Sequence, residues 1–220
     1  MQEIAPDVFH LPLVPRSGIN AYLVGDVIVD AGLAGSAKKI VKALAGRSVR
    51  AHALTHAHVD HAGGSRRLVD ALELPLWASA GDADDVRSGE PALAESRLQP
   101  LLAFASGFDG VDVARELREG DEVAADFVVV ELPGHSPGQI GFWRESDRVL
   151  LAGDVLTHMS LLTTAVGLRL PPALLTVDPI GNRESARKAA RLEPAVVGFG
   201  HGPVLSAATP KLEAFIAQMR

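Results

Sequence analysis

The sequence predicts an α/β protein in which layers of β-sheet are covered by helices, arranged as one domain over residues 1–220. The composition, 47% hydrophobic and 22% charged over 220 residues, is enough to bury a sizeable core. Short runs typical of strands alternate along the chain with helical patterns. Several of these runs end on a glycine followed by His or Asp, which indicates a polar site at a sheet edge.

The first third of the chain contains most of this alternation. Strands are expected at Val8–Val14, Ala21–Val24, Val27–Asp30, Ala51–Leu54 and Leu74–Ala78. The Gly25-Asp26 pair suits a hairpin turn between the second and third of them. Helices are expected from Ser36, as N-cap, to Ala45 and over Ser65–Leu72.

The pattern weakens between Gly81 and Gly120, where Pro91–Phe104 is predicted as a helix. Beyond it, strands are predicted at Asp126–Leu132, Gln139–Arg144, Arg148–Ala152 and Ala195–Phe199. Two helices, Asn182–Leu192 and Lys211–Met219, complete the chain.

The run His56-Ala57-His58-Val59-Asp60-His61 is dense in metal-binding side chains. If the run is extended, His56, His58 and Asp60 lie on one side of the backbone and His61 points away unless the chain turns. The Gly63-Gly64 pair is suited to such a turn, so one run could supply ligands to two neighbouring metal ions.

Three further ligands share one local pattern, since His135, Asp154 and His201 each follow a strand and a glycine. Together these seven residues suit two metals. The first would be held by His56, His58 and His135, and the second by Asp60, His61 and His201. Asp154 would bridge them, and an open position would remain for water between ions roughly 3.5–4 Å apart. The chain has no cysteine, so imidazole and carboxylate are the ligands available; zinc is preferred, while iron or manganese also fits.

With these motifs and their order, the chain resembles the metallo-β-lactamase-fold superfamily of hydrolases. The family's H-x-H-x-D-H corresponds to His56–His61, its G-H-S to Gly134-His135-Ser136, its G-D to Gly153-Asp154 and its G-H-G to Gly200-His201-Gly202. The resemblance covers nearly the whole chain. It implies a four-layer αββα sandwich with the metals in a cleft along one edge.

The chemistry expected of such a site is hydrolysis of a small ester, thioester or lactone by a hydroxide held between two metals. Asp60 is the predicted catalytic residue, because it would ligate the second metal and also accept or return a proton. Thr55 and Ser136 could support the ligands, although for each of them an ordinary backbone hydrogen bond is an equal expectation.

Several branches of the superfamily can be compared with the residues. A true β-lactamase is not expected, because the Cys-containing subclass needs a thiolate and the other dinuclear subclass lacks a bridging aspartate. Glyoxalase II is closer, since Asn20–Val24 resembles its early strand, but the 19 residues after His201 are too few for its glutathione-binding helical domain. Lactonases of the quorum-quenching type share the ligands but often place a tyrosine after the bridging aspartate, where this chain has Val155–His158.

Alternatives outside hydrolysis are a persulfide dioxygenase-like oxidoreductase with one iron, or a metal-binding protein without catalysis. A nuclease of the tRNA-processing type, and nucleic-acid binding in general, conflict with the net charge of −6. Neither a signal peptide nor a membrane span is recognised, so a cytoplasmic protein with a small-molecule substrate is expected, and a homodimer is left open.

Three histidines lie outside the predicted cluster. His10 and His52 are expected to be structural, and His158 is a candidate substrate contact. The segments Gly81–Gly120 and Val155–Pro179 are expected near the mouth of the cleft. They would either wall an apolar pocket for an acyl chain or form core or a dimer contact, and the second interpretation is favoured.

Overall fold

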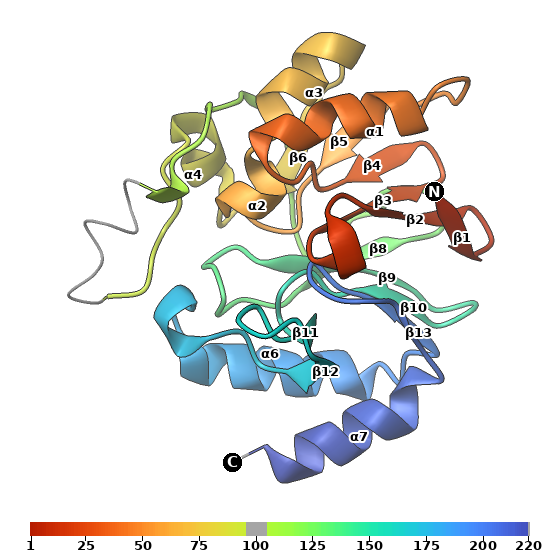
Figure 1. Cartoon of the computed structure of the whole chain (residues 1–220), viewed down its shortest axis with the longest axis vertical. Helices are drawn as coiled ribbons and strands as arrows, with labels where there is room; N and C mark the ends of the chain where they lie inside the picture. The colour runs from red at the N-terminus through yellow and green to blue at the C-terminus, as the bar shows by residue number, and fades with distance from the viewer. Residues whose placement is uncertain (96–104, 220) are drawn as a thin grey trace.

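The computed structural model describes residues 1–95 and 105–219. Its elements form four layers, with helices on the outside and two β-sheets facing each other in the middle (Figure 1). This arrangement confirms the predicted αββα sandwich.

The N-terminal half forms a seven-stranded sheet in the order of the chain. Its strands are β1 (Gln2–Ala5), β2 (Val8–Pro12), β3 (Asn20–Val24), β4 (Val27–Val29), β5 (Ala51–Ala53), β6 (Leu76–Ser79) and β7 (Val113–Leu117). The strands from β1 to β4 pair antiparallel as hairpins, whereas β4, β5, β6 and β7 are parallel. The carboxyl ends of β4, β5 and β6 therefore lie side by side at one edge.

The C-terminal half forms a five-stranded sheet in the order β14-β13-β10-β9-β8. Its strands are β8 (Val128–Glu131), β9 (Ile140–Arg144), β10 (Val149–Leu151), β13 (Val196–Gly198) and β14 (Leu205–Ser206). A separate hairpin consists of β11 (Thr157–Met159) and β12 (Val166–Arg169).

Helices cover the outer face of each sheet (Figure 1). The described α-helices are α1 (Ala37–Ala43), α2 (Val59–Ala62), α3 (Ser65–Leu72), α4 (Ala83–Ser88), α6 (Pro179–Arg191) and α7 (Ala208–Gln218), and the 3₁₀ turns are η1 (Pro15–Ser17), η2 (Ala34–Ser36) and η3 (Ala173–Leu175). Helices α1 and α3 pack on the first sheet, and α6 and α7 on the second. Within the described ranges, none of the helices combines the length and the apolar character needed to cross a bilayer.

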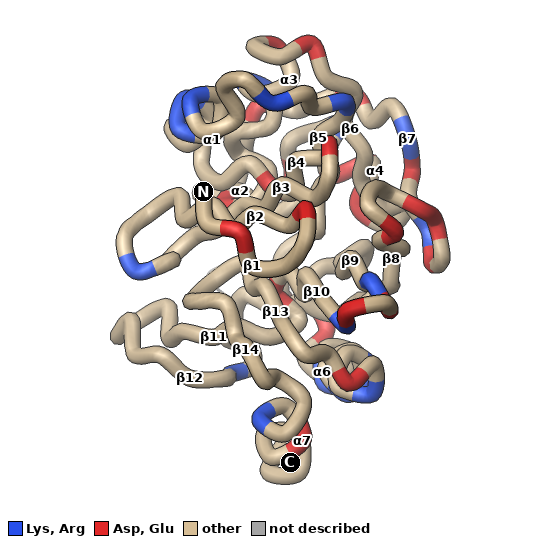
Figure 2. The backbone as a smooth tube through the Cα atoms, turned by 90° about the vertical axis from the view of Figure 1, so that its right-hand side faces the viewer, with Lys and Arg blue, Asp and Glu red and all other residues tan. Residues whose placement is uncertain are grey.

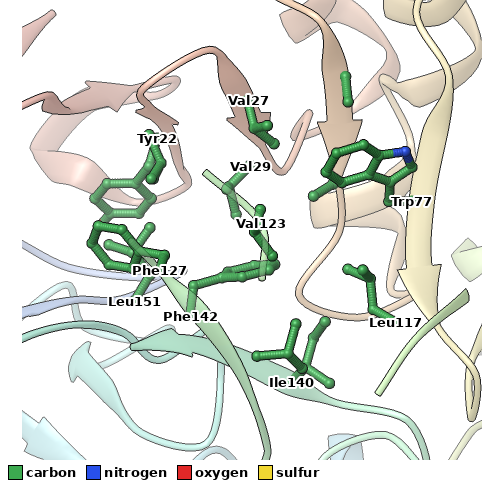
Figure 3. Packing of buried hydrophobic residues seen from close by; sticks show 14 of the residues in the cluster. Tyr22, Val27, Val29, Trp77, Leu117, Val123, Phe127, Ile140, Phe142 and Leu151 are labelled. Atoms are coloured by element: carbon green, nitrogen blue, oxygen red, sulfur yellow. The ribbon is translucent and has the colours of Figure 1, made fainter. Parts of the chain in front are cut away.

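Strand alternation explains why there are three apolar layers. Val27 and Val29 of β4 point between the sheets toward Phe142 and Leu151 (Figure 3), while Ile28 between them faces α1. In the second sheet, Phe142 points inward while Trp143 packs toward α6 and α7. Each strand therefore contributes to two cores, which accounts for its nearly continuous hydrophobic character.

Most sequence-predicted elements are present, with ends shifted by at most three residues. The main difference is the predicted helix Pro91–Phe104. Residues 91–95 are not helical, and the remainder of that prediction lies outside the described residues. The Ala92 amide donates to the Asp85 side chain at 2.8 Å, which holds the chain against the end of α4. The elements not predicted are short: β1, α2, α4, β7, β11, β12 and β14.

Candidate metal centre

The predicted ligands follow strands that end at the same edge of the sandwich. Strands β8 and β10 are both antiparallel to β9, and β10 is parallel to β13, so β8, β10 and β13 run in one direction. Their carboxyl ends lead to His135, Asp154 and His201. The remaining ligands follow β5 of the facing sheet, so both sheets contribute to one site.

The His-rich run is extended only as far as His58, which is the N-cap of the short helix α2. The chain therefore turns at Val59, before the Gly63-Gly64 pair that the sequence suggested. The His61 amide donates to the His58 carbonyl at 2.9 Å, which closes this turn. As a result, both Asp60 and His61 point into the cluster instead of away from it.

All seven predicted ligands meet in one cluster. Their ligand atoms fall into three overlapping groups, each with atoms within 4.8 Å of one another: His56, His58 and His135; His56, His61 and Asp154; and Asp60, His61 and His201. Asp154 lies between the groups. Its Oδ2 is 3.1 Å from His201 Nε2 and 3.7 Å from His135 Nε2, and its Oδ1 is 3.6 Å from His61 Nε2.

Several of these atoms are buried without a hydrogen-bond partner. They are the Nε2 atoms of His56, His58 and His61 and the Oδ1 atom of Asp154. A buried polar atom left unpaired costs about 1–3 kcal/mol, so four of them on residues of one cluster need an explanation. The donor set of imidazole nitrogens and carboxylate oxygens fits divalent metal ions, which would satisfy such atoms.

Most of the imidazoles are oriented by a hydrogen bond from Nδ1. His61 Nδ1 donates to Asp30 at 2.8 Å, and His201 Nδ1 donates to the Gly18 carbonyl at 2.5 Å. His56 Nδ1 contacts Thr55 Oγ1 at 3.1 Å, and His135 Nδ1 contacts Thr176 Oγ1 at 3.3 Å. In each case Nε2 is left to face the cluster. His58 differs, because its Nδ1 is the nitrogen that faces His135 Nε2, at 2.9 Å.

Asp30 is a residue in contact with the cluster that the sequence did not single out. It is buried at the carboxyl end of β4, next to β5, and accepts hydrogen bonds from His61, from the Thr55 amide at 2.8 Å and from the Thr55 hydroxyl. The expected supporting role of Thr55 is thus visible as a link between Asp30 and His56. The signal available in the sequence was a polar residue ending a strand that pairs in parallel with the His-bearing strand.

Asp82 is a second residue that the sequence did not single out. Its buried carboxylate accepts from the Ala57 amide at 3.0 Å, from Ser136 Oγ at 2.7 Å and from the Gly138 amide at 2.6 Å. It therefore ties the loop of His56 and His58 to the loop of His135. Burial raises the pKa of Asp82, although these hydrogen bonds oppose the shift.

The His201 loop is held by strand β3 and by the segment before it. Asn20 Nδ2 donates to the carbonyls of Phe199 and Gly202, at 2.9 and 2.8 Å, and Tyr22 Oη donates to Phe199 at 2.9 Å. His10 bonds to Asn20 Oδ1 at 2.8 Å. Its predicted structural role is thus confirmed, as is that of His52, which is buried and bonded to Ile28 and Ser65.

Glycine allows the two halves to approach at these loops. Gly153 has a φ of +55°, a conformation that side chains rarely adopt, and it turns the chain immediately before Asp154. At Gly200 a Cβ atom would lie 2.1 Å from Asp154 Oδ1 and 2.4 Å from the His61 ring. A side chain at Gly200 would therefore displace the ligands.

The charges of the cluster suit a cation. Burial lowers the pKa of His56, His58 and His135, that of His135 to about 3, so these imidazoles are neutral electron-pair donors. Burial opposes ionisation of Asp60 and Asp154 too, but the neighbouring His201 and His61 hold the pKa of both carboxyls below its usual range. Two carboxylates therefore place negative charge among the imidazoles.

His61 and His201 behave differently from the other three imidazoles. Burial alone would lower their pKa values, yet Asp30 and Asp154 raise that of His61, and Asp154 and Asp60 raise that of His201 to about 10. Without a metal these two side chains hold protons, and a metal ion that binds to their Nε2 atoms would displace them.

A cavity of about 240 Å³ opens onto the cluster. Its walls combine predicted ligands with four apolar residues and one serine: His58, Val59, Asp60, Leu93, Ser106, His135, Asp154, Leu161, Leu175 and His201. The segments 81–120 and 155–179 thus both contribute to the mouth, as predicted. His158, the candidate substrate contact, is not among the described residues that line this cavity. Its Nδ1 donates to the Pro203 carbonyl at 2.8 Å, and its ring lies 5.4 Å from that of Phe199.

The fold and the site together define a class of protein: an αββα sandwich with a His/Asp cluster at the sheet edges that indicates divalent metal ions. The chain belongs to the metallo-beta-lactamase superfamily, whose family model matches residues 14–201. That match includes all seven clustered residues.

Relatives of this chain include metallo-hydrolases. The probable metallo-hydrolase YflN of Bacillus subtilis is 29% identical over 201 residues, which span 80% of this chain and 75% of YflN. The hydroxyacylglutathione hydrolase GloC of Haemophilus influenzae is 29% identical over 163 residues, which span 67% of this chain and 72% of GloC.

Two solved structures are also similar. TTHA1623 in a di-iron-bound form is 29% identical, with a TM-score of 0.70 over 91% of this chain and 96% of TTHA1623. The B3 metallo-beta-lactamase BLEG-1 is 28% identical, with a TM-score of 0.71 over 92% of this chain and 95% of BLEG-1.

Proposed function

We propose that this protein is a dinuclear-metal hydrolase that cleaves a small ester, thioester or lactone. In this proposal His56, His58 and His135 hold one metal, Asp60, His61 and His201 hold the other, and Asp154 bridges them. The protein acts on a small molecule in the cytoplasm, without nucleic-acid or membrane partners.

The observation that carries the proposal is the position of Asp154 between two sets of ligand atoms. Its two carboxylate oxygens face different partners, Oδ1 toward His61 and Oδ2 toward His135 and His201. One carboxylate close to both sets of ligand atoms could bridge two adjacent metals, which supports a site for two ions.

Metals bound there would lower the pKa of water toward about 7 and polarise the bond to be cleaved. The protein would fix the positions of the metal-ligating side chains, leave one side of the site open to the cavity, and accept or return a proton during hydrolysis. Asp60 is proposed for the last role, because it lines the cavity and its carboxylate is anionic. The similarity to GloC supports a thioester as one substrate class.

The test is a panel of thioesters, lactones and activated esters, assayed with zinc-, iron- and manganese-loaded protein. We expect hydrolysis of at least one class, with zinc as the most effective metal and with no consumption of oxygen. A β-lactam belongs in the panel because of the similarity to BLEG-1. We expect no turnover of it.

The second candidate function is a persulfide dioxygenase-like reaction at one iron. It is supported by the three-imidazole group of His56, His58 and His135, which could hold iron without the second set, and by the di-iron neighbour. One iron per chain together with oxygen consumption on a persulfide substrate, and no hydrolysis, would replace the hydrolase proposal with this one.

A further inference from the structure

An exposed apolar surface lies next to the candidate metal centre. Among the described residues, all the exposed large hydrophobic side chains except Met1 and Leu33 fall between residues 161 and 180: Leu161, Leu162, Val166, Leu174, Leu175, Val177 and Ile180. We call these seven residues the apolar rim. Leu162 is 93% exposed and Ile180 73% exposed, so the rim is solvated at a considerable cost in free energy.

Charge is nearly absent from the segment that carries the rim. Arg169 is the one Lys, Arg, Asp or Glu between Asp154 and Asp178. Figure 2 shows the β11–β12 hairpin as tan tube with a blue position at β12, whereas blue and red positions occur together on β7 and α6, and α1 carries blue positions. The rim is therefore a local departure from an otherwise mixed, charged surface.

The rim is continuous with the cavity over the metal cluster. Leu161 and Leu175, each 37% exposed, also line the cavity beside Asp60 and Asp154. The cavity, about 240 Å³, is smaller than the roughly 300–1,000 Å³ of a typical ligand pocket. A ligand whose reacting end fills the cavity would thus extend over the rim.

The side chains that line the cavity indicate which kind of ligand it can bind. Apart from the clustered His and Asp residues, the described lining consists of Val59, Leu93, Ser106, Leu161 and Leu175. Four of these five side chains are apolar and none carries a charge, so the Ser106 hydroxyl is the one group among them that could hydrogen-bond to the carboxylates or the ammonium group of a glutathione leaving group. An aliphatic chain, by contrast, needs no hydrogen-bond partner and gains by leaving water.

Both leucines are held at fixed positions relative to the ligands. The His158 amide, in β11, donates to the His201 carbonyl at 2.9 Å, and Arg16 donates to Thr164 Oγ1 at 2.8 Å in the loop that follows Leu161. Near Leu175, the Val177 amide donates to the His135 carbonyl at 3.2 Å, and Thr176 contacts His135 Nδ1. The apolar walls are therefore built onto the loops that carry two of the metal ligands.

We propose that Leu161 and Leu175 bind the acyl chain of the substrate, which is aliphatic and several carbons long, and that the chain continues over Leu162 and Leu174. This inference rests on the proposed hydrolase function and specifies its substrate as an acyl ester or thioester with an uncharged acyl part. It also reverses the interpretation favoured by the sequence, in which these segments form core or a dimer contact.

The test is a series of p-nitrophenyl esters from acetate to decanoate, assayed with wild type, Leu161→Asn and Leu175→Asn. We expect kcat/KM of wild type to rise roughly twofold per methylene through the middle of the series. This corresponds to about half of the free energy gained when a methylene is completely buried, because the open surface covers only one side of the acyl chain. Each Asn variant should lose roughly tenfold on octanoate and less than twofold on acetate. Leu33→Asn is the matched control, since Leu33 is similarly exposed, at 42%, and does not line the cavity.

A binding measurement separates this inference from the hydrolase proposal. The affinities of acetate, hexanoate and decanoate for the metal-loaded protein are measured by calorimetry, which needs no turnover. We expect affinity to increase with chain length in wild type and in Leu33→Asn, and to do so much less in the two cavity variants. Hydrolysis with no dependence of rate or binding on chain length would overturn the acyl site and leave the hydrolase intact. Binding that depends on chain length without any hydrolysis would overturn the hydrolase proposal and leave the acyl site intact.

A second copy of the chain is the competing occupant of the rim. Light scattering of wild type and of the Leu161→Asn variant decides this point. If the variant dissociates a dimer while its chain-length profile matches that of wild type, the acyl site is wrong and the rim is a dimer interface. We expect the same mass for both proteins.

Discussion

At the scale of single residues, the cluster is organised by what the second nitrogen of each imidazole contacts. Four of the histidines contact a neighbouring oxygen through Nδ1, on Asp30, Thr55, Gly18 or Thr176, and the Nε2 atoms of the same rings face Asp154. Such contacts fix both the ring orientation and the tautomer.

The ligands themselves give the first prediction. Asp154→Ala and His58→Ala should each abolish hydrolysis and lower metal content, because each removes donor atoms from the cluster. Far-ultraviolet circular dichroism should show little loss of folded protein, since the sandwich core does not include these side chains. A fully active Asp154→Ala variant with its full metal content would disprove the bridging role.

The second prediction concerns Asp30, which does not face the cavity. Asp30→Asn keeps the size of the side chain but removes the anionic acceptor of His61 Nδ1, so metal affinity should fall about 10–100-fold. Competition with a chelator measures the affinity. Asp26→Asn, at an exposed carboxylate paired with Arg50, is the control and should leave the affinity unchanged. Equal affinities for the two variants would contradict the role of Asp30.

The sequence predicted the seven clustered residues because each belongs to a short motif with a recognisable spacing. Asp30 and Asp82 carry no such motif. Their roles depend on which strands are neighbours, β4 beside β5 for Asp30 and the close approach of the Asp82 and Gly138 loops for Asp82. Strand order and loop approach are tertiary facts, which local patterns do not specify.

At the scale of elements, the site results from strands that end together. Strands β8, β10 and β13 run in one direction, and each ends in glycine-containing sequence that lets the next residue project toward β5 and its loop. The short helix α2 completes the site by turning Asp60 and His61 into it. The sequence indicated a turn here but not its position, since four residues are too few to show helical periodicity.

Helix α6 gives the third prediction. Its N-cap, Asp178, accepts from the amides of Ile180 and Gly181 at 3.0 and 2.9 Å, whereas Ser36, the N-cap of α1, makes no capping hydrogen bond. Asp178→Ala should therefore lower the free energy of unfolding by about 1 kcal/mol, whereas Ser36→Ala should have little effect. Urea denaturation measures both variants. Equal losses would mean that the capping bonds do not stabilise α6.

At the scale of the whole molecule, the sandwich positions two half-sites. The first sheet supplies the His-rich run, the second supplies His135, Asp154 and His201, and the core shown in Figure 3 holds the two sheets against each other. The layered fold could be predicted because each strand alternates between two apolar faces. The strand order could not, because pairing between distant segments leaves no mark in a single sequence.

Metal removal gives the fourth prediction, and it concerns the whole fold. Metal ions that bind the folded chain at 100 times their Kd stabilise it by about 2.7 kcal/mol per site. Removing them with a chelator should therefore lower Tm, by about 5–10 °C per site for a domain of this size. Scanning calorimetry measures the shift, and Asp154→Ala should show a smaller one. An unchanged Tm in wild type would mean that the cluster does not bind metal in the folded state.

The central claim is that one chain holds two divalent metals bridged by Asp154. It is tested most directly by measuring the metal content of the purified wild-type protein with inductively coupled plasma mass spectrometry. The proposal predicts two metal equivalents per chain, and it predicts that His135→Ala and His201→Ala each reduce this number. A single equivalent in wild type that is lost in His135→Ala but retained in His201→Ala would contradict it, because one metal would then occupy the three-imidazole group alone.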